Sequence, residues 1–200
     1  PTALRLAAIW ELQDLEKAII ELQRRFQDKE HELGDVVMTG RTQLQDAVPM
    51  TVGVMFGAFA EALARDRWRV FKSVERLKIV NLGGTAIGTG VGAPRKFIFQ
   101  VIEQLRALTD LPFSRAENPV EATSNQDAVV EVDGILSAMA SNLLKIAGDL
   151  RILSMSAVGE VRLPAVQAGS SIMPGKVNPV IPEYVSQVSI EVISAHFALT

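Results

Sequence analysis

Apolar side chains recur along most of this chain at alternating intervals of three and four residues, the spacing that places them on one face of an α-helix. The first such stripe runs from Leu12 to Phe26, and charged residues fill the other faces. Gly34 then supplies a residue that commonly ends a helix. The pattern predicts a long helix that ends near Gly34.

A second stripe follows Pro49, where bulky apolar residues keep the helical spacing as far as Leu77. The run Asn81-Leu82-Gly83-Gly84 is a strong C-terminal signal and predicts the end of a second long helix. A shorter helix is predicted over residues 94–108.

The two remaining stripes are the most regular. One alternates three and four throughout: Val129, Val132, Leu136, Met139, Leu143, Ile146, Leu150 and Leu153. The other follows Pro179: Ile181, Val185, Val188, Val192, Ala195 and Leu199. We find no alternating apolar and polar run of useful length, so the sequence predicts an all-α domain over residues 1–200, an elongated bundle of long helices.

The glycine-rich run 83–92 raises the question of nucleotide binding. The dinucleotide fingerprint requires a preceding strand and a βαβ unit, and a phosphate loop requires Gly-Lys-Ser/Thr; neither pattern is present. We therefore interpret these glycines as permitting a tight connection and close contact between helices.

Composition and charge narrow the classes of function. The net charge of -3, with mixed signs along the chain, gives no basic surface for nucleic acid. The chain has no cysteine and two histidines, so we predict no disulfide, no metal and no cofactor. No run is long and apolar enough for a membrane span, so a cytoplasmic protein is expected. Helical periodicity begins by Leu4 and still runs at Thr200, which leads us to expect a fragment of a longer chain.

The run Gly169-Ser170-Ser171-Ile172-Met173-Pro174-Gly175-Lys176-Val177-Asn178-Pro179 carries the chemistry. Asn178-Pro179 is a helix-start signal, with Asn178 expected as the cap. The loop therefore leads into a helix N-terminus, where free amides favour an anion. From the residues alone, a plain anion-binding loop and a Ser170/Lys176 hydrolase both remain open.

A second polar cluster, Thr39 to Met50, lies in what the pattern predicts to be a short connection between two apolar helices. Binding groups are often found in such connections. Within the cluster, Arg41 and Asp46 are expected to form an ion pair or to cap a helix.

Both clusters closely resemble signature segments of the aspartase/fumarase superfamily. The loop matches over eleven consecutive positions, and Gly40-Arg41-Thr42-Gln43-Leu44-Gln45-Asp46-Ala47-Val48-Pro49 is similar to the aspartase branch. Residues 80–90 and 163–167 also fit, so the resemblance covers nearly the whole chain.

The resemblance implies a lyase that releases fumarate, with ammonia eliminated from L-aspartate. It places the general base on Ser170 and a carboxylate-binding role on Lys176 and Asn178, with Ser171 contacting a second carboxylate. It also implies that Thr42 and Gln43 reach the substrate from a neighbouring subunit of a homotetramer whose sites are composite.

Three departures from the superfamily pattern qualify these roles. Gln43 stands at the position of a histidine in fumarases, and that histidine pairs with a glutamate that matches Glu183. A glutamine side chain cannot carry a proton. The resemblance therefore favours aspartase over fumarase. Residues 154–161 lack the Ser-Gly-Pro-Arg-Ala-Gly motif that usually precedes the loop in this superfamily. The N-terminal substrate contacts of the family are absent, so these residues alone should be inactive. Fumarate hydratase or another fumarate-releasing lyase, and a catalytically inactive crystallin-like relative, remain as alternatives.

Overall fold

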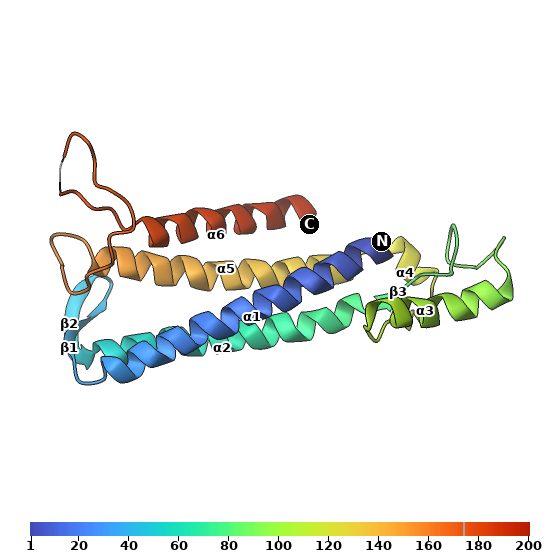
Figure 1. The fold of residues 1–200 in the computed structure, drawn as a ribbon, viewed down its shortest axis with the longest axis horizontal. Helices are drawn as coiled ribbons and strands as arrows, with labels where there is room; N and C mark the ends of the chain where they lie inside the picture. Colours follow the sequence, from blue (N-terminus) through green and yellow to red (C-terminus); the bar gives the residue numbers. More distant parts are fainter. Residues whose placement is uncertain (174) are drawn as a thin grey trace. The chain divides into compact units, whose positions relative to one another are not determined.

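A computed structural model describes residues 1–173 and 175–200, and the long helices predicted from the apolar stripes are present in it (Figure 1). The helices are α1 (Thr2–Glu32), α2 (Val52–Leu77), α3 (Arg95–Thr109), α4 (Glu121–Ser124), α5 (Asp127–Leu153) and α6 (Val180–Leu199). The predicted all-α class is confirmed.

The described residues also include short strands, which the apolar pattern did not predict. Strands β1 (Val37–Thr42) and β2 (Gln45–Thr51) form an antiparallel pair, and β3 (Ile79–Val80) lies parallel to β4 (Ser114–Arg115). The β1–β2 pair is the larger of the two and carries part of the candidate site.

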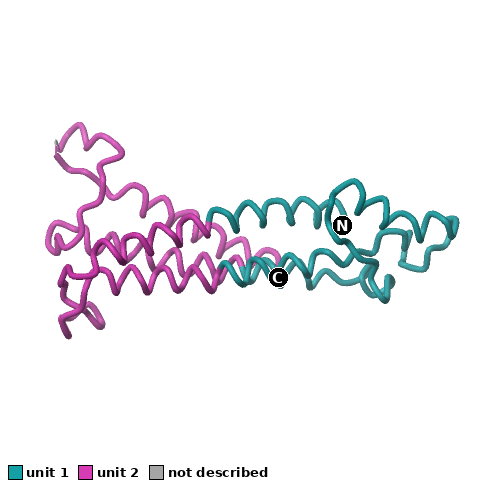
Figure 2. The backbone as a smooth tube through the Cα atoms, turned by 60° about the horizontal axis from the view of Figure 1, so that its bottom comes forward, with its two compact units in different colours: residues 1–18, 67–135 teal, residues 19–66, 136–200 magenta. Residues whose placement is uncertain are grey.

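The chain divides into two compact units (Figure 2): residues 1–18 with 67–135, and residues 19–66 with 136–200. We call them unit 1 and unit 2. Every candidate site residue belongs to unit 2.

Unit 1 has its core around Phe113 and Leu77, which are fully buried. The glycine-rich run 83–92 lies in this unit and packs closely, since a Cβ atom on Gly88 would collide with the backbone of Val120. Gly88 also has a φ of 90°, a conformation that side-chain-bearing residues rarely adopt. The interpretation of these glycines as a tight structural connection is confirmed.

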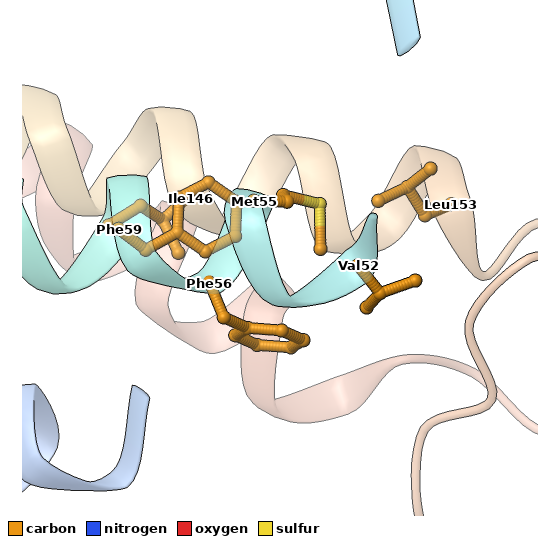
Figure 3. Packing of buried hydrophobic residues seen from close by; sticks show 6 residues of the cluster. All are labelled: Val52, Met55, Phe56, Phe59, Ile146 and Leu153. Carbon is orange, nitrogen blue, oxygen red and sulfur yellow. The ribbon is translucent and has the colours of Figure 1, made fainter. Parts of the chain in front are cut away.

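Unit 2 has a core between the start of α2 and the end of α5 (Figure 3). The stripe of α2 contributes Val52, Met55, Phe56 and Phe59, and α5 contributes Ile146 and Leu153. Partly buried side chains complete this cluster, among them Phe26 of α1 and Met38 and Met50 of the two strands. The β1–β2 pair is thus attached to the core through its methionines.

The stripe predicted for α5 is confirmed, because each of its eight members is buried or half-buried. The stripe predicted for α6 is not the face that this chain buries. Ile181 and Val188 are 57% and 44% exposed, whereas Ser186 and Ser189 are 6% and 3% exposed. The hydroxyl of Ser186 donates to the carbonyl of Pro182 at 2.8 Å, so this polar group is satisfied within its own helix and can be buried at little cost.

Candidate active site

The polar cluster at residues 39–50 is a β-hairpin, which corrects the expectation of a plain connection between helices. Its two-residue turn consists of Gln43 and Leu44, with φ values of 52° and 60°, between the paired residues Thr42 and Gln45. Turns with two positive φ values suit the twist of a hairpin but normally use Asn-Gly. The side chains of Gln43 and Leu44 therefore cost about 1–2 kcal/mol each in this conformation.

This strain is retained at the exposed tip of the hairpin, where Thr42 and Gln43 both lie on the surface. Non-glycine residues in the left-handed region occur preferentially at ligand clamps and active sites, where the surrounding structure holds them in place. The φ values of Gln43 and Leu44 are those that a two-residue hairpin turn of this type requires.

Arg41, the residue before Thr42, holds the hairpin to a distant part of unit 2. Its Nη1 and Nη2 atoms donate to the two carboxylate oxygens of Glu160 at 2.8 and 2.7 Å. Its Nε donates to Oδ1 of Asp46, across the hairpin, at 2.9 Å. The expected ion pair of Arg41 and Asp46 is confirmed, but Glu160 is a partner that sequence reasoning missed, because nothing local links positions 119 residues apart.

Each side chain of this pair favours the charged form of the other. Hydrogen bonding to Glu160 is the largest effect raising the pKa of Arg41, and burial opposes it. Hydrogen bonding from Arg41 likewise lowers the pKa of Glu160 below its ordinary value, again against burial. The two side chains are 25% and 23% exposed, so the pair lies at the edge of the protein interior.

The loop of residues 169–179 folds back on itself, and Pro174 lies outside the described residues. A Cβ atom on Gly169 would lie 2.9 Å from the carbonyl oxygen of Lys176, so the two ends of the loop touch. Ser170 is half-buried at this closure, and its hydroxyl oxygen accepts hydrogen bonds from the backbone amides of Ile172 and Met173 at 3.2 and 3.4 Å. Ser170 and Lys176 are therefore placed at the two ends of one closed loop.

The loop leads into α6, but the predicted cap is wrong. Pro179 is the N-cap, with no side-chain hydrogen bond to the helix, and Val180 is the first helical residue. The carbonyl of Asn178 accepts a bond from the amide of Val180 at 2.9 Å, which directs the chain into the helix through the backbone. The first amides of α6 are thus left without a side-chain cap and retain their partial positive charge.

A cavity of about 670 Å³ lies beside this helix start. The segment 154–165 supplies most of its wall, and Val177, Asn178 and Pro179 supply the rest. The segment turns tightly, since the amide of Val161 donates to the carbonyl of Leu153 at 3.1 Å. The atypical residues 154–161 are therefore part of the wall of this cavity.

The candidate residues are brought together only in part. They all belong to unit 2, where the hairpin and residues 154–173 occupy the same end (Figure 1, left). Ser171, Lys176 and Asn178 are exposed. In the described part of the chain, no hydrogen bond joins Ser170 to Lys176, and none joins Gln43 to Glu183, which lies half-buried in the first turn of α6.

Among residues 1–173 and 175–200, no helix combines the length and apolar character that crossing a membrane requires.

Comparisons with known proteins agree with the fold. A family model described as "Lyase" matches residues 1–194. The chain is 45% identical to aspartate ammonia-lyase of Corynebacterium glutamicum, over 100% of this chain and 39% of that protein. It is 43% identical to class II fumarate hydratase of Xylella fastidiosa, over 100% of this chain and 43% of that protein.

Among solved structures, the cobalt-bound fumarate lyase/delta crystallin of Brucella melitensis superposes with a TM-score of 0.95 at 46% identity. That match covers 99% of this chain and 44% of the other. The chain therefore spans less than half the length of the relatives it matches.

Proposed function

Because this chain belongs to the lyase family, we propose that the full-length protein eliminates ammonia from L-aspartate to give fumarate. The 200 residues would form its central helical domain, since the chain spans 39% of the length of the aspartate ammonia-lyase of C. glutamicum. The observation that carries the proposal is the environment of the Ser170 hydroxyl, which accepts two backbone amides at the closure of the loop.

A serine can act as a base only in its ionised form, so its oxyanion must be stabilised. Hydrogen bonds donated to a charged group favour that charged form, and the amides of Ile172 and Met173 are placed to donate them. Ser170 then takes the proton from the carbon beside one carboxylate of aspartate. The bond between the next carbon and nitrogen breaks, the carbon–carbon double bond of fumarate forms, and ammonia leaves with the electron pair of the broken bond.

The intermediate before that cleavage carries two negative charges on one carboxylate, so donors placed in advance are the main requirement. Lys176 and Asn178 would hold this carboxylate, and Ser171 would contact the second one. The uncapped N-terminus of α6 adds a partial positive charge directly after Asn178. The loop and the helix start thus supply the field that this intermediate requires.

Thr42 and Gln43 would bind the substrate of a neighbouring subunit, in a homotetramer with composite sites. The exposed apolar side chains of α6, among them Ile181 and Val188, support such an assembly, because they lack cover within this chain. Glu183 would support the site from the first turn of α6. We place the enzyme in the cytoplasm, without nucleic-acid or membrane partners.

Fumarate hydratase is the second candidate, because the identity to that relative, 43%, is close to the 45% for aspartate ammonia-lyase. Hydration of fumarate requires a proton to be delivered along with the hydroxyl group. Gln43 cannot carry a proton, whereas the amino group of aspartate leaves already protonated and needs less acid assistance. Gln43 therefore favours the ammonia-lyase.

Two alternatives have less support. A Ser170/Lys176 hydrolase needs the lysine to activate the serine, but the described hydrogen bonds of Ser170 come from the backbone amides of Ile172 and Met173. A crystallin-like relative without activity would have no need of Ser170, Lys176 and Asn178 together, and all three are present.

The test is fumarate release by the full-length protein, followed spectrophotometrically with L-aspartate, L-malate and argininosuccinate in parallel. We expect aspartate to have the highest kcat/KM. A higher value for malate would support the hydratase, and release from none of the three would contradict the proposed function.

A further inference from the structure

The Arg41–Glu160 pair joins two elements that the proposed function uses separately. Arg41 directly precedes Thr42 at the tip of the hairpin, and Glu160 lies ten positions before Ser170, on the segment that leads into the loop. Nothing in the proposed roles of Ser170, Lys176, Asn178, Thr42 and Gln43 requires this pair.

The pair has the geometry of a specific clamp. Both guanidinium nitrogens of the Arg41 fork meet both oxygens of one carboxylate, at 2.8 and 2.7 Å. Such two-point contact fixes orientation as well as distance, which a single ammonium–carboxylate contact does not. Three of the Arg41 donor groups are engaged, since Nε also holds Asp46.

The hairpin needs an external support of this kind. Its turn residues Gln43 and Leu44 hold strained φ values, and β2 is exposed over most of its length. Side chains near the other end of the hairpin, Met38 and Met50, anchor it to the core, whereas the Arg41 contact lies beside the tip. The segment 154–165 likewise has few buried residues of its own.

We propose that Arg41 is a positioning residue for the elimination: through Glu160 it holds the Thr42-Gln43 turn and the approach to the Ser170 loop in one fixed arrangement. This inference rests on the proposed function at Ser170. Arg41 itself would not touch the substrate, and its effect would reach both the binding residues of the turn and the base of the loop.

The kinetic test uses the full-length protein with Arg41→Gln, Arg41→Lys, Glu160→Gln and the double variant Arg41→Gln/Glu160→Gln. Each single variant should lower kcat/KM for aspartate by about 10- to 100-fold, the range for residues that orient catalytic groups. The KM should rise as kcat falls, because both the turn and the loop are displaced. The double variant should be no worse than either single one, since both changes remove the same contact.

Arg41→Lys separates geometry from charge. Lysine retains the positive charge but cannot make the two-point contact, so Arg41→Lys should behave like Arg41→Gln.

Asp46→Asn is the matched control: it also removes a carboxylate from Arg41, but one that is 77% exposed and lies on the same hairpin. Lys29→Gln, in an exposed pair with Glu32, is the control for loss of any ion pair. Both controls should have near wild-type kinetics.

Hydrogen exchange supplies a readout independent of activity. Deuterium uptake at residues 39–47 should rise in Glu160→Gln, and uptake at residues 156–168 should rise in Arg41→Gln. Reciprocal effects in a protein that releases no fumarate would contradict the proposed function and support the clamp.

The inference is overturned if Arg41→Gln and Glu160→Gln retain wild-type kcat and KM. It is also overturned if kcat falls with an unchanged KM in proportion to the loss of folded protein, which a purely structural role would produce. Uptake confined to the mutated segment in both variants would likewise contradict it.

Discussion

At the scale of single residues, the site depends on where hydrogen bonds are donated. The hydroxyl oxygen of Ser170 receives two backbone amides, and the carboxylate of Glu160 receives two nitrogens of Arg41. In both cases the donated hydrogen bonds favour a negative charge on the acceptor. The amide contacts of Ser170 support its proposed role as the base, and the Arg41 contact fixes the position of the hairpin.

The Glu160 contact has a defined dependence on pH. Hydrogen bonding from Arg41 lowers the pKa of the Glu160 carboxyl in the folded protein. The contact therefore stabilises the fold fully above the ordinary carboxyl pKa of 4.5, and this stabilisation is lost as the pH falls through the lowered pKa. Hydrogen-exchange protection of residues 39–47, corrected for intrinsic rates, should stay constant from neutral pH to about pH 5 and fall in more acidic solution.

Glu160→Gln is the control for this dependence, because it should be poorly protected at every pH and show no acid step at these residues. A loss of protection near neutral pH in the wild-type protein would contradict the assignment of the step to Glu160.

At the scale of elements, the hairpin and the facing helices α2 and α5 are stabilised by different means. The hairpin carries two strained turn residues and is exposed along most of its length. The helices bury the apolar cluster of unit 2 and one polar contact, in which Nδ2 of Asn142 on α5 donates to Oδ2 of Asp66 on α2 at 2.8 Å. Asp66 is fully buried.

Leu44→Gly should stabilise the hairpin locally. Leu44 has a φ of 60° and a side chain that is 71% exposed, so glycine removes strain and gives up little packing. Allowing for the greater backbone entropy of glycine in the unfolded chain, the opening free energy of the hairpin should rise by about 0.5–1 kcal/mol, measured by native-state hydrogen exchange. Leu44→Ala retains the Cβ and should bring no gain; an equal gain from alanine would show that strain is not the cause.

Asn142→Leu should destabilise unit 2. The change leaves the buried carboxylate of Asp66 one donor short, which costs about 1–3 kcal/mol in the free energy of unfolding. Ser141→Ala is the control, because its hydroxyl is exposed and donates to the carbonyl of Ser137 in its own helix. Its effect should stay within about 0.5 kcal/mol. Equal destabilisation by the two changes in denaturant titrations would refute the role of the buried contact.

The sequence predicted the helices well because burial of a helix is a periodic, local property. The stripe of α5 shows this, since every member is at least half-buried. The hairpin lacks such a periodic pattern, because β2 is exposed on both faces and contains Pro49. Its turn is also Gln43-Leu44 in place of Asn-Gly.

Two further features depend on tertiary packing that the sequence pattern does not encode. The buried face of α6 carries small serines, because Ser186 satisfies its own hydroxyl within the helix. The pairing of Arg41 with Glu160 joins positions 119 residues apart. The identities of the candidate site residues came from motif resemblance, whereas the amide contacts of Ser170 became evident only in the structure.

At the scale of the whole molecule, the chain spans 39% of the aspartate ammonia-lyase relative of C. glutamicum. The proposed site combines the Ser170 loop, a turn from a neighbouring subunit and contacts from outside these residues. The central claim therefore has to be tested in the full-length, assembled protein.

The most direct measurement compares fumarate release from saturating L-aspartate by the full-length wild-type protein and by Ser170→Ala. If Ser170 is the base, kcat should fall by about 10²- to 10⁴-fold, with the secondary structure and oligomeric state of the variant unchanged. A kcat for Ser170→Ala close to the wild-type value would remove Ser170 from the base role and contradict the proposed mechanism.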